Sequence, residues 1–114
     1  VGATTIMVSN HGGRQLDGSR SPFDQLEEIV DEVGDQVDVI CDGGIRRGTH
    51  ILKALSVGAK ACSGGRLYLY ALACGGHKGV ERAYNLIEEE IIRDMKLMGC
   101  NSIKELTRSN LRYR

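Results

Sequence analysis

Three short apolar runs alternate with longer segments of helical periodicity along the chain. The runs Ile6–Val8, Val37–Cys41 and Ala59–Ser63 have the length and composition of buried β-strands. Between them, apolar residues recur every three to four positions over 22–33 and 49–57, which predicts two amphipathic helices. Strands separated by single helices require crossover connections and form parallel sheets. The expected fold class is therefore α/β.

Local signals mark the expected ends of the two helices. Ser21 followed by Pro22 is typical of a helix start, since the hydroxyl caps and the proline ring suits the first helical position. Gly34 is placed to end the first helix in a left-handed conformation. Thr49 is the expected N-cap of the second helix, which Gly58 closes.

Helical periodicity continues beyond the third strand. A helical stretch over 67–73 leads through Gly75 and Gly76 into a long amphipathic helix over 80–98. The acidic run Glu88–Glu90 is expected to form a solvated face of that helix.

The overall composition narrows the possible functions. The 114 residues carry 15 basic and 15 acidic side chains, so neither a nucleic-acid footprint nor a field for acidic substrates is indicated. Aromatic residues make up only 4%, so stacking platforms for single-stranded nucleic acid are not expected. No run approaches the roughly 20 apolar residues that a membrane span requires.

The four cysteines are irregularly spaced and form no Cys-x-x-Cys pair. This pattern favours reduced thiols in a cytoplasmic protein over disulfides or a metal site, so no metal is predicted. Peripheral attachment to an inner membrane is left open.

Each expected strand ends in a polar, glycine-rich loop: Asn10–Gly13, Asp42–Gly44 and Gly64–Arg66. Ligands of parallel α/β folds bind at the carboxyl ends of the strands, so these loops should meet at one site. Backbone amides freed by glycines, with Arg46 and Arg66 close by, indicate a phosphate cradle. The alternative is a pair of tight strand-to-helix turns with surface arginines.

The first loop places His11 and Arg14 three positions apart, with two glycines between them. Imidazole takes up a proton near neutral pH, and a guanidinium binds a carboxylate through two parallel hydrogen bonds. The pair therefore suggests a base and an anion clamp facing one small acid. In the alternative interpretation, His11 only holds the loop together. His50 and His77 lack such neighbours and are expected to be solvated.

Three segments carry a resemblance to a known family: Ser9–Asp17, Asp42–Gly48 and the pair Gly65-Arg66. They resemble the FMN-dependent α-hydroxy acid oxidases and dehydrogenases, which include L-lactate dehydrogenase, lactate oxidase, glycolate oxidase and mandelate dehydrogenase. The resemblance covers essentially the whole chain. It implies a (β/α)8 TIM barrel of typically about 250 residues, of which residues 1–114 would supply roughly the last three β/α units. That portion would be the C-terminal part of a single FMN-binding domain.

The resemblance also implies roles for individual residues. His11 matches the active-site base that accepts the substrate's proton while the flavin takes up a hydride equivalent. Arg14 matches the residue that holds the substrate carboxylate. Contacts to FMN are implied for Ser9, Asp42, Gly43, Gly44, Arg46, Gly65 and Arg66. The implied reaction is oxidation of an L-2-hydroxy acid, with L-lactate as the expected substrate, to the 2-oxo acid by a homo-oligomeric enzyme.

The chain departs from the family pattern in two ways. The family's lysine near the flavin, its active-site tyrosines and the aspartate that orients the base lie upstream, so an incomplete fragment with poor activity is expected. Ser63, Gly64 and Leu67 replace two bulky apolar residues and a small residue or proline, which removes filling from the barrel. Two other hypotheses remain: a non-catalytic module for phosphate binding, FMN binding or assembly, and a related FMN barrel with another substrate.

Overall fold

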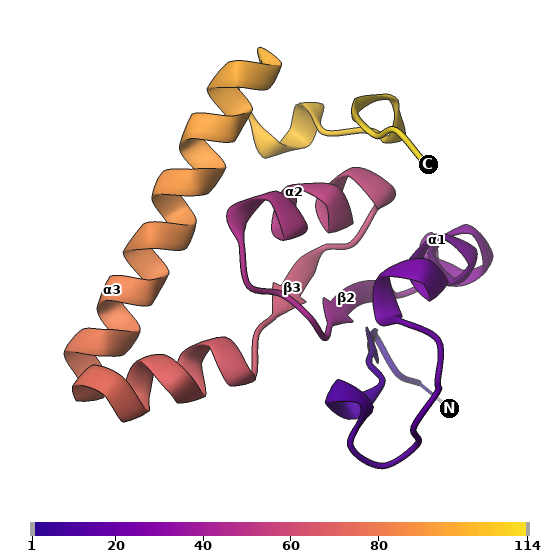
Figure 1. Cartoon of the computed structure of the whole chain (residues 1–114). Helices are drawn as coiled ribbons and strands as arrows, with labels where there is room; N and C mark the ends of the chain where they lie inside the picture. Colours follow the sequence, from indigo (N-terminus) through magenta and orange to yellow (C-terminus); the bar gives the residue numbers. More distant parts are fainter. Residues whose placement is uncertain (1, 114) are drawn as a thin grey trace.

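A computed structural model describes residues 2–113, whose centre is a three-stranded parallel sheet (Figure 1). The strands are β1 (Thr5–Val8), β2 (Asp38–Asp42) and β3 (Ala61–Ser63), and β2 lies in the middle. The expected parallel α/β arrangement is confirmed.

The three strands alternate with three helices, α1 (Pro22–Val33), α2 (Gly48–Val57) and α3 (Arg66–Met98). Figure 1 shows α3 turning sharply partway along its length. The turn lies at Gly75 and Gly76, whose backbone angles are not helical. The two helical stretches expected here are therefore confirmed as the arms of one bent helix. Within residues 2–113, no helix combines the length and hydrophobicity that a membrane crossing needs.

The core lies between one face of the sheet and the helices α1 and α2. Its buried members come from the sheet and from both helices: Val8, Leu26, Val39, Cys41, Ala54, Val57 and Ala59. Alternation along β1 turns Met7 to the opposite face, where it is 54% exposed. The expectation of a buried first strand is therefore wrong for Met7, because this strand is packed on one face only.

The end of α1 differs from the expectation at Gly34. Its φ is −68°, which is right-handed, so the predicted left-handed cap is wrong. A steric constraint favours glycine at this position instead, since a Cβ there would lie 2.5 Å from the carbonyl oxygen of Val30. That oxygen accepts a hydrogen bond from the Gly34 N–H at 2.9 Å.

The start of α2 is capped from another helix. The helix begins at Gly48, so the predicted cap by Thr49 is wrong. The carboxylate of Glu90 on α3 accepts the Gly48 N–H at 2.7 Å and pairs with Arg47 at 2.7 Å. The solvated face expected over Glu88–Glu90 is thus wrong for Glu90, whose side chain is only 19% exposed. The hydrogen bond from Gly48, followed by the charge of Arg47, lowers the pKa of Glu90.

Two 3₁₀ turns, η2 (Ile103–Glu105) and η3 (Arg108–Asn110), lead back from α3 to the other helices. The Arg108 guanidinium donates to both carboxylate oxygens of Asp31 on α1, at 2.5 and 3.3 Å. It also pairs with Glu27 at 3.2 Å. The last residues are thereby tied to the first helix, and the hydrogen bonds from Arg108 lower the pKa of Asp31.

Candidate active site

The carboxyl ends of the three strands open onto one cavity of about 570 Å³. This volume falls within the range of roughly 300–1,000 Å³ typical of small-ligand sites. Eight of the nine site residues predicted from the sequence line it: His11, Arg14, Asp42, Gly43, Gly44, Arg46, Gly65 and Arg66. The three glycine-rich loops therefore do meet at one place.

The ninth residue, Ser9, joins the first loop to the second. Its hydroxyl donates to the Asp42 carboxylate at 2.6 Å and accepts the backbone N–H of His11 at 3.0 Å. Ser9 thus fixes the position of a carboxylate in the wall of the cavity.

The first loop contains a strained backbone position at His11. The loop forms a single 3₁₀ turn, η1 (His11–Gly13), in which the Asn10 side chain accepts the Gly12 N–H at 3.1 Å. His11 has a φ of 54°, a left-handed conformation that non-glycine residues rarely adopt. Such strain persists where the surrounding structure requires it, and functional sites are common places for it.

The imidazole ring of His11 contacts a side chain that sequence reasoning missed. Its Nδ1 is hydrogen-bonded to the Oε1 of Gln15. An amide oxygen only accepts, so this contact requires a proton on Nδ1 and leaves Nε2 of the neutral ring able to accept another. The spacing of four residues was the one signal in the sequence that could have indicated the contact.

Arg66 links the third loop to the first. Its Nη2 donates to the carbonyl oxygen of Gly12 at 2.7 Å. A Cβ on Gly12 would lie 2.5 Å from the same nitrogen, so only glycine permits this approach. The guanidinium is therefore held at the mouth of the cavity by backbone from another strand.

The second loop is supported from behind by His50. The His50 Nδ1 lies 3.1 Å from the Gly44 carbonyl oxygen and 3.3 Å from the Arg46 backbone nitrogen. The ring is partly buried, so the expectation of a solvated His50 is wrong. The exposed His77 fits the expectation.

The chemical groups around the cavity suit a phosphate monoester that carries hydroxyl groups. The first N–H groups of α3 follow Gly65, and such groups have no partner within their own helix. A Cβ on Gly44 or Gly65 would meet nothing within 4 Å, so a ligand can approach this backbone closely. Arg46 and Arg66 supply positive charge, and Asp42 supplies an acceptor for hydroxyl groups. This donor set fits the ribityl phosphate of FMN.

Two of the arginines remain available for an anion. Over the described residues 2–113, neither Arg14 nor Arg46 forms an ion pair with a carboxylate. Both residues are exposed, and both line the cavity. A carboxylate ligand and a phosphate group could therefore each find a guanidinium.

The two cysteines of the sheet, Cys41 and Cys62, provide no nucleophile for this site. Cys41 on β2 lies opposite Cys62 on β3, both are free thiols, and neither lines the cavity. Burial raises the pKa of Cys62 to about 12 and also raises that of Cys41. Both therefore stay protonated at neutral pH, which leaves them unreactive.

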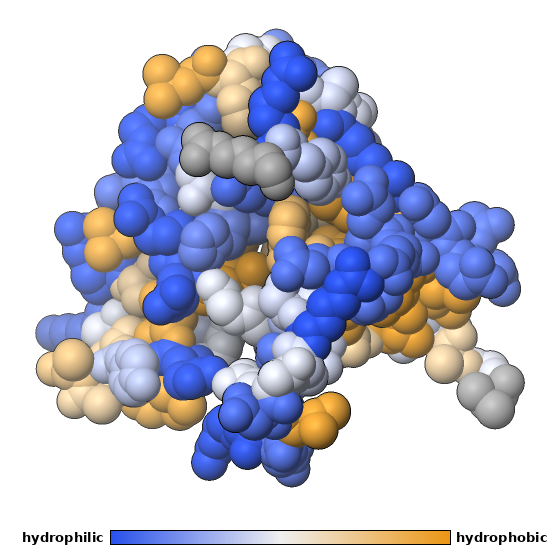
Figure 2. All heavy atoms as spheres, turned by 45° about the vertical axis from the view of Figure 1, so that its right-hand side comes forward, coloured by the Kyte–Doolittle hydropathy of each residue, from blue (hydrophilic) through white to orange (hydrophobic). Residues whose placement is uncertain are grey.

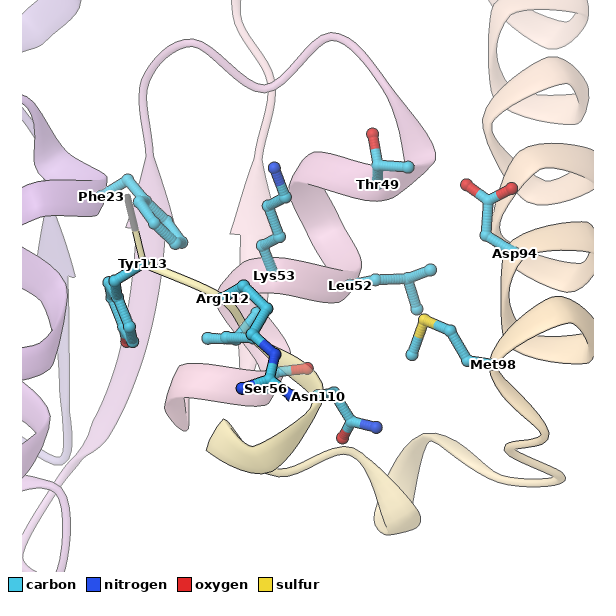
Figure 3. A pocket seen from close by; sticks show the side chains of 11 residues that line it. Phe23, Thr49, Leu52, Lys53, Ser56, Asp94, Met98, Asn110, Arg112 and Tyr113 are labelled. Atoms are coloured by element: carbon cyan, nitrogen blue, oxygen red, sulfur yellow. The ribbon is translucent and has the colours of Figure 1, made fainter.

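A smaller cavity of about 210 Å³ lies between α2, the second arm of α3 and the end of the chain (Figure 3). Figure 3 shows Leu52 and Met98 facing each other across it, with Asp94 on α3 and Tyr113 at its margins. It contains none of the predicted site residues. The chemistry indicated by the sequence therefore belongs to the larger cavity.

Comparison with known proteins places the chain in a family. The model of the FMN-dependent dehydrogenases matches residues 1–113, so the chain belongs to the FMN-dependent dehydrogenase family. An L-lactate oxidase from Nostoc sp. is 48% identical over 110 residues, which cover 96% of this chain and 30% of that protein. The L-lactate dehydrogenase (cytochrome) of Saccharomyces cerevisiae is 46% identical over 111 residues, which cover 93% of this chain and 19% of that protein.

Solved structures agree with this assignment. An active chimera of (S)-mandelate dehydrogenase is 41% identical, with a TM-score of 0.94 over 99% of this chain and 31% of that one. A mandelate oxidase with benzoyl-formic acid is 46% identical, with a TM-score of 0.89, and the match covers 94% of this chain and 32% of that one. The resemblance drawn from the motifs is confirmed, as is FMN as the cofactor of the family. The chain spans 30% or less of the two curated relatives named above.

Proposed function

We propose that the chain is the C-terminal portion of a single FMN-binding (β/α)8 barrel domain and supplies roughly its last three β/α units. Exposed apolar surface supports contact of this portion with further protein, and Figure 2 shows such surface as separate hydrophobic patches among hydrophilic areas. Large exposed side chains include Leu69 at 61% and Tyr70 at 66% on the first arm of α3, and Met7 on the sheet. Exposed apolar patches of this kind are typical of surfaces that contact further protein.

The proposed activity of the complete protein is FMN-dependent oxidation of an L-2-hydroxy acid, most simply L-lactate, to the 2-oxo acid. The convergence of His11 and Arg14 with two glycine–arginine loops in one cavity carries the proposal. The names of similar proteins, L-lactate oxidase and L-lactate dehydrogenase, point to the same substrate class.

Two side chains would act on the substrate. Arg14 would bind the carboxylate and so fix the orientation of the neighbouring hydroxyl-bearing carbon. His11 would accept the proton at Nε2, because Nδ1 is engaged with Gln15. FMN, when bound, supplies the electron acceptor for the reaction.

The remaining site residues would hold the cofactor. Arg46 and Arg66, with the amides beside Gly44 and Gly65, would bind the phosphate. Asp42, oriented by the Ser9 hydroxyl, would accept hydrogen bonds from the ribityl chain, and Gly43 would shape the turn between them.

Replacement of the base in the full-length protein tests the assignment. We expect His11→Ala to lower lactate-dependent dye reduction by about 10²- to 10⁴-fold while bound FMN is retained. His77→Ala, which removes an exposed histidine on α3, is the matched control and should turn over normally. Unchanged turnover in His11→Ala would contradict the role of His11 as the base, whereas no lactate-dependent turnover by the unmodified full-length protein would favour a non-catalytic FMN-binding or assembly module.

The 114-residue chain alone is expected to be a poor catalyst. It contains the proposed base and clamp, but the family's other active-site residues would come from upstream. Purified chain mixed with FMN and L-lactate should therefore reduce dye far more slowly than the full-length protein. Comparable rates would contradict the barrel-fragment proposal.

A further inference from the structure

We propose that His50 is a positioning residue of the phosphate cradle, whose protonation increases the affinity of the cradle for an anion. The inference rests on the proposed function, in which the loop after β2 holds the FMN phosphate. It goes further in giving that loop a pH-dependent support that is separate from the base and the clamp.

The geometry around the His50 Nδ1 permits two different hydrogen bonds. Without a proton, Nδ1 accepts the backbone N–H of Arg46, 3.3 Å away. With a proton, it donates to the carbonyl oxygen of Gly44, 3.1 Å away. One nitrogen cannot make both bonds at once, so its protonation decides which backbone group is engaged.

Protonation changes the cradle in two ways that act in the same direction. The neutral ring has a form that occupies the Arg46 N–H, whereas the imidazolium always carries a proton on Nδ1 and releases that donor. The imidazolium also adds a positive charge directly behind the loop, where it attracts an anion. Both changes favour a bound phosphate, so deprotonation of His50 should weaken its binding.

The charged groups around His50 provide no competing partner for the imidazolium. The ring lines a third cavity of about 460 Å³, which shares Gly43 and Gly44 with the candidate site and is also lined by Lys53 from α2 and Arg66 from α3. Among the described residues, none that lines this cavity is a carboxylate. The nearby Arg47 is already paired with Glu90 at the start of α2. The like charges of Lys53 and Arg66 oppose protonation of the ring, and a phosphate in the cradle would offset that repulsion.

The pH dependence of FMN binding tests this role in the full-length protein. FMN dissociation constants are measured by flavin fluorescence at about pH 6 and about pH 8, on either side of the usual titration range of imidazole. His50→Asn is the matched variant, because its amide lies near the position of Nδ1, can serve either backbone group and does not titrate. His50→Gln provides a second variant without titration, and His77→Asn is the control for an unrelated histidine.

The expected result is a difference between the variants in how steeply FMN affinity changes with pH. From pH 6 to pH 8, FMN affinity should fall about fivefold more in the unmodified protein and His77→Asn than in His50→Asn and His50→Gln. Titration of the phosphate itself affects every variant equally and cancels in this comparison. Riboflavin, which lacks the phosphate, should show no such difference.

Other outcomes identify which proposal fails. Equal slopes in all four proteins, with FMN bound, would overturn the role of His50 and leave the proposed function standing. The same slope difference for riboflavin would overturn the role of the loop in phosphate binding. No FMN binding by the unmodified protein at either pH would overturn the proposed function, and the role of His50 with it.

Discussion

The rim of the cavity and the helical layer behind it are held together by different kinds of contact. At the rim, hydrogen bonds join neighbouring loops, as the Ser9 hydroxyl does with the Asp42 carboxylate and the Arg66 guanidinium does with the Gly12 carbonyl oxygen. In the helical layer, charged side chains join the helices, as Glu90 does by pairing with Arg47 and Arg108 does by pairing with Asp31. Both regions join segments that are distant in the sequence, but the rim does so through hydrogen bonds between loops, whereas the helical layer does so through ion pairs and a helix cap.

This difference teaches where each region tolerates change. Substitutions of rim residues that line the cavity should weaken ligand binding, because these loops surround the ligand and the core lies elsewhere. Substitutions at the contacts of the helical layer should alter stability and leave the turnover of the FMN-bound protein unchanged. Four changes in the full-length protein test this division.

The largest effect on stability is expected for Gly48→Ala. A Cβ there would lie 2.7 Å from the Glu90 Cβ and 2.8 Å from the backbone nitrogen of Ile91, so α2 and α3 would have to separate. The expected loss is about 2–4 kcal/mol in the free energy of unfolding by urea. Thr49→Ala, at the position where the sequence suggested a cap, should cost less than about 0.5 kcal/mol. Equal losses for both would contradict the close contact between the helices.

Gly12→Ala should weaken the cofactor site. The new Cβ would displace the end of the Arg66 side chain, while the positive φ of 68° adds backbone strain. Gly13→Ala is the control, since its φ is 71° and its Cβ would meet nothing within 4 Å. Both variants should lose about 1–2 kcal/mol of stability, but only Gly12→Ala should bind FMN about tenfold more weakly in a fluorescence titration. Equal FMN affinity would show that the Arg66–Gly12 bond does not position the guanidinium.

Glu90→Gln should cost about 1 kcal/mol by weakening the cap on α2. The pKa of Glu90 is lowered in the folded state, so its contribution is complete above the ordinary carboxyl value of 4.5 and is lost as the pH falls through the folded value. Urea unfolding from neutral to acidic pH should therefore show the two proteins converging in acid. Glu89→Gln, on the exposed side of the same helix, should leave this pH dependence intact. A constant difference at every pH would contradict the ionic cap.

The smallest effect is expected for Arg108→Gln. Its partners Asp31 and Glu27 are exposed to solvent, at 58% and 39% of their side chains, so screening reduces the value of these ion pairs. We expect Tm to fall by about 1–3 °C at low salt and by less at high salt. A larger fall that salt does not change would indicate a packing role for the arginine.

Much of the fold followed from the sequence because its signals are local. The apolar runs gave the three strands, and the periodicity around Leu26 gave α1, since both patterns report one buried face. The glycines and arginines of the loops predicted one shared site, because parallel strands end at the same edge of a sheet. The roles assigned to those residues stay predictions until variants are measured.

The rest could not be predicted because it depends on contacts across the fold. Nothing near Gly48 in the sequence indicates that Glu90, 42 residues away, caps its helix. The left-handed backbone of His11 was equally hidden, since residues other than glycine rarely adopt it. His50 was expected to be solvated because it has no neighbouring Arg or glycine pair like that of His11, and its actual partners are backbone groups, which carry no signature of their own in a sequence.

The bend in α3 has a consequence for the size of the molecule. An α-helix rises about 1.5 Å per residue, so 33 residues in a straight line would extend about 50 Å. The longest dimension of the molecule is 41 Å. A straight rod would therefore project into solvent, and the two glycines at 75 and 76 let a single helix reach both the ligand cavity and the far end of α2.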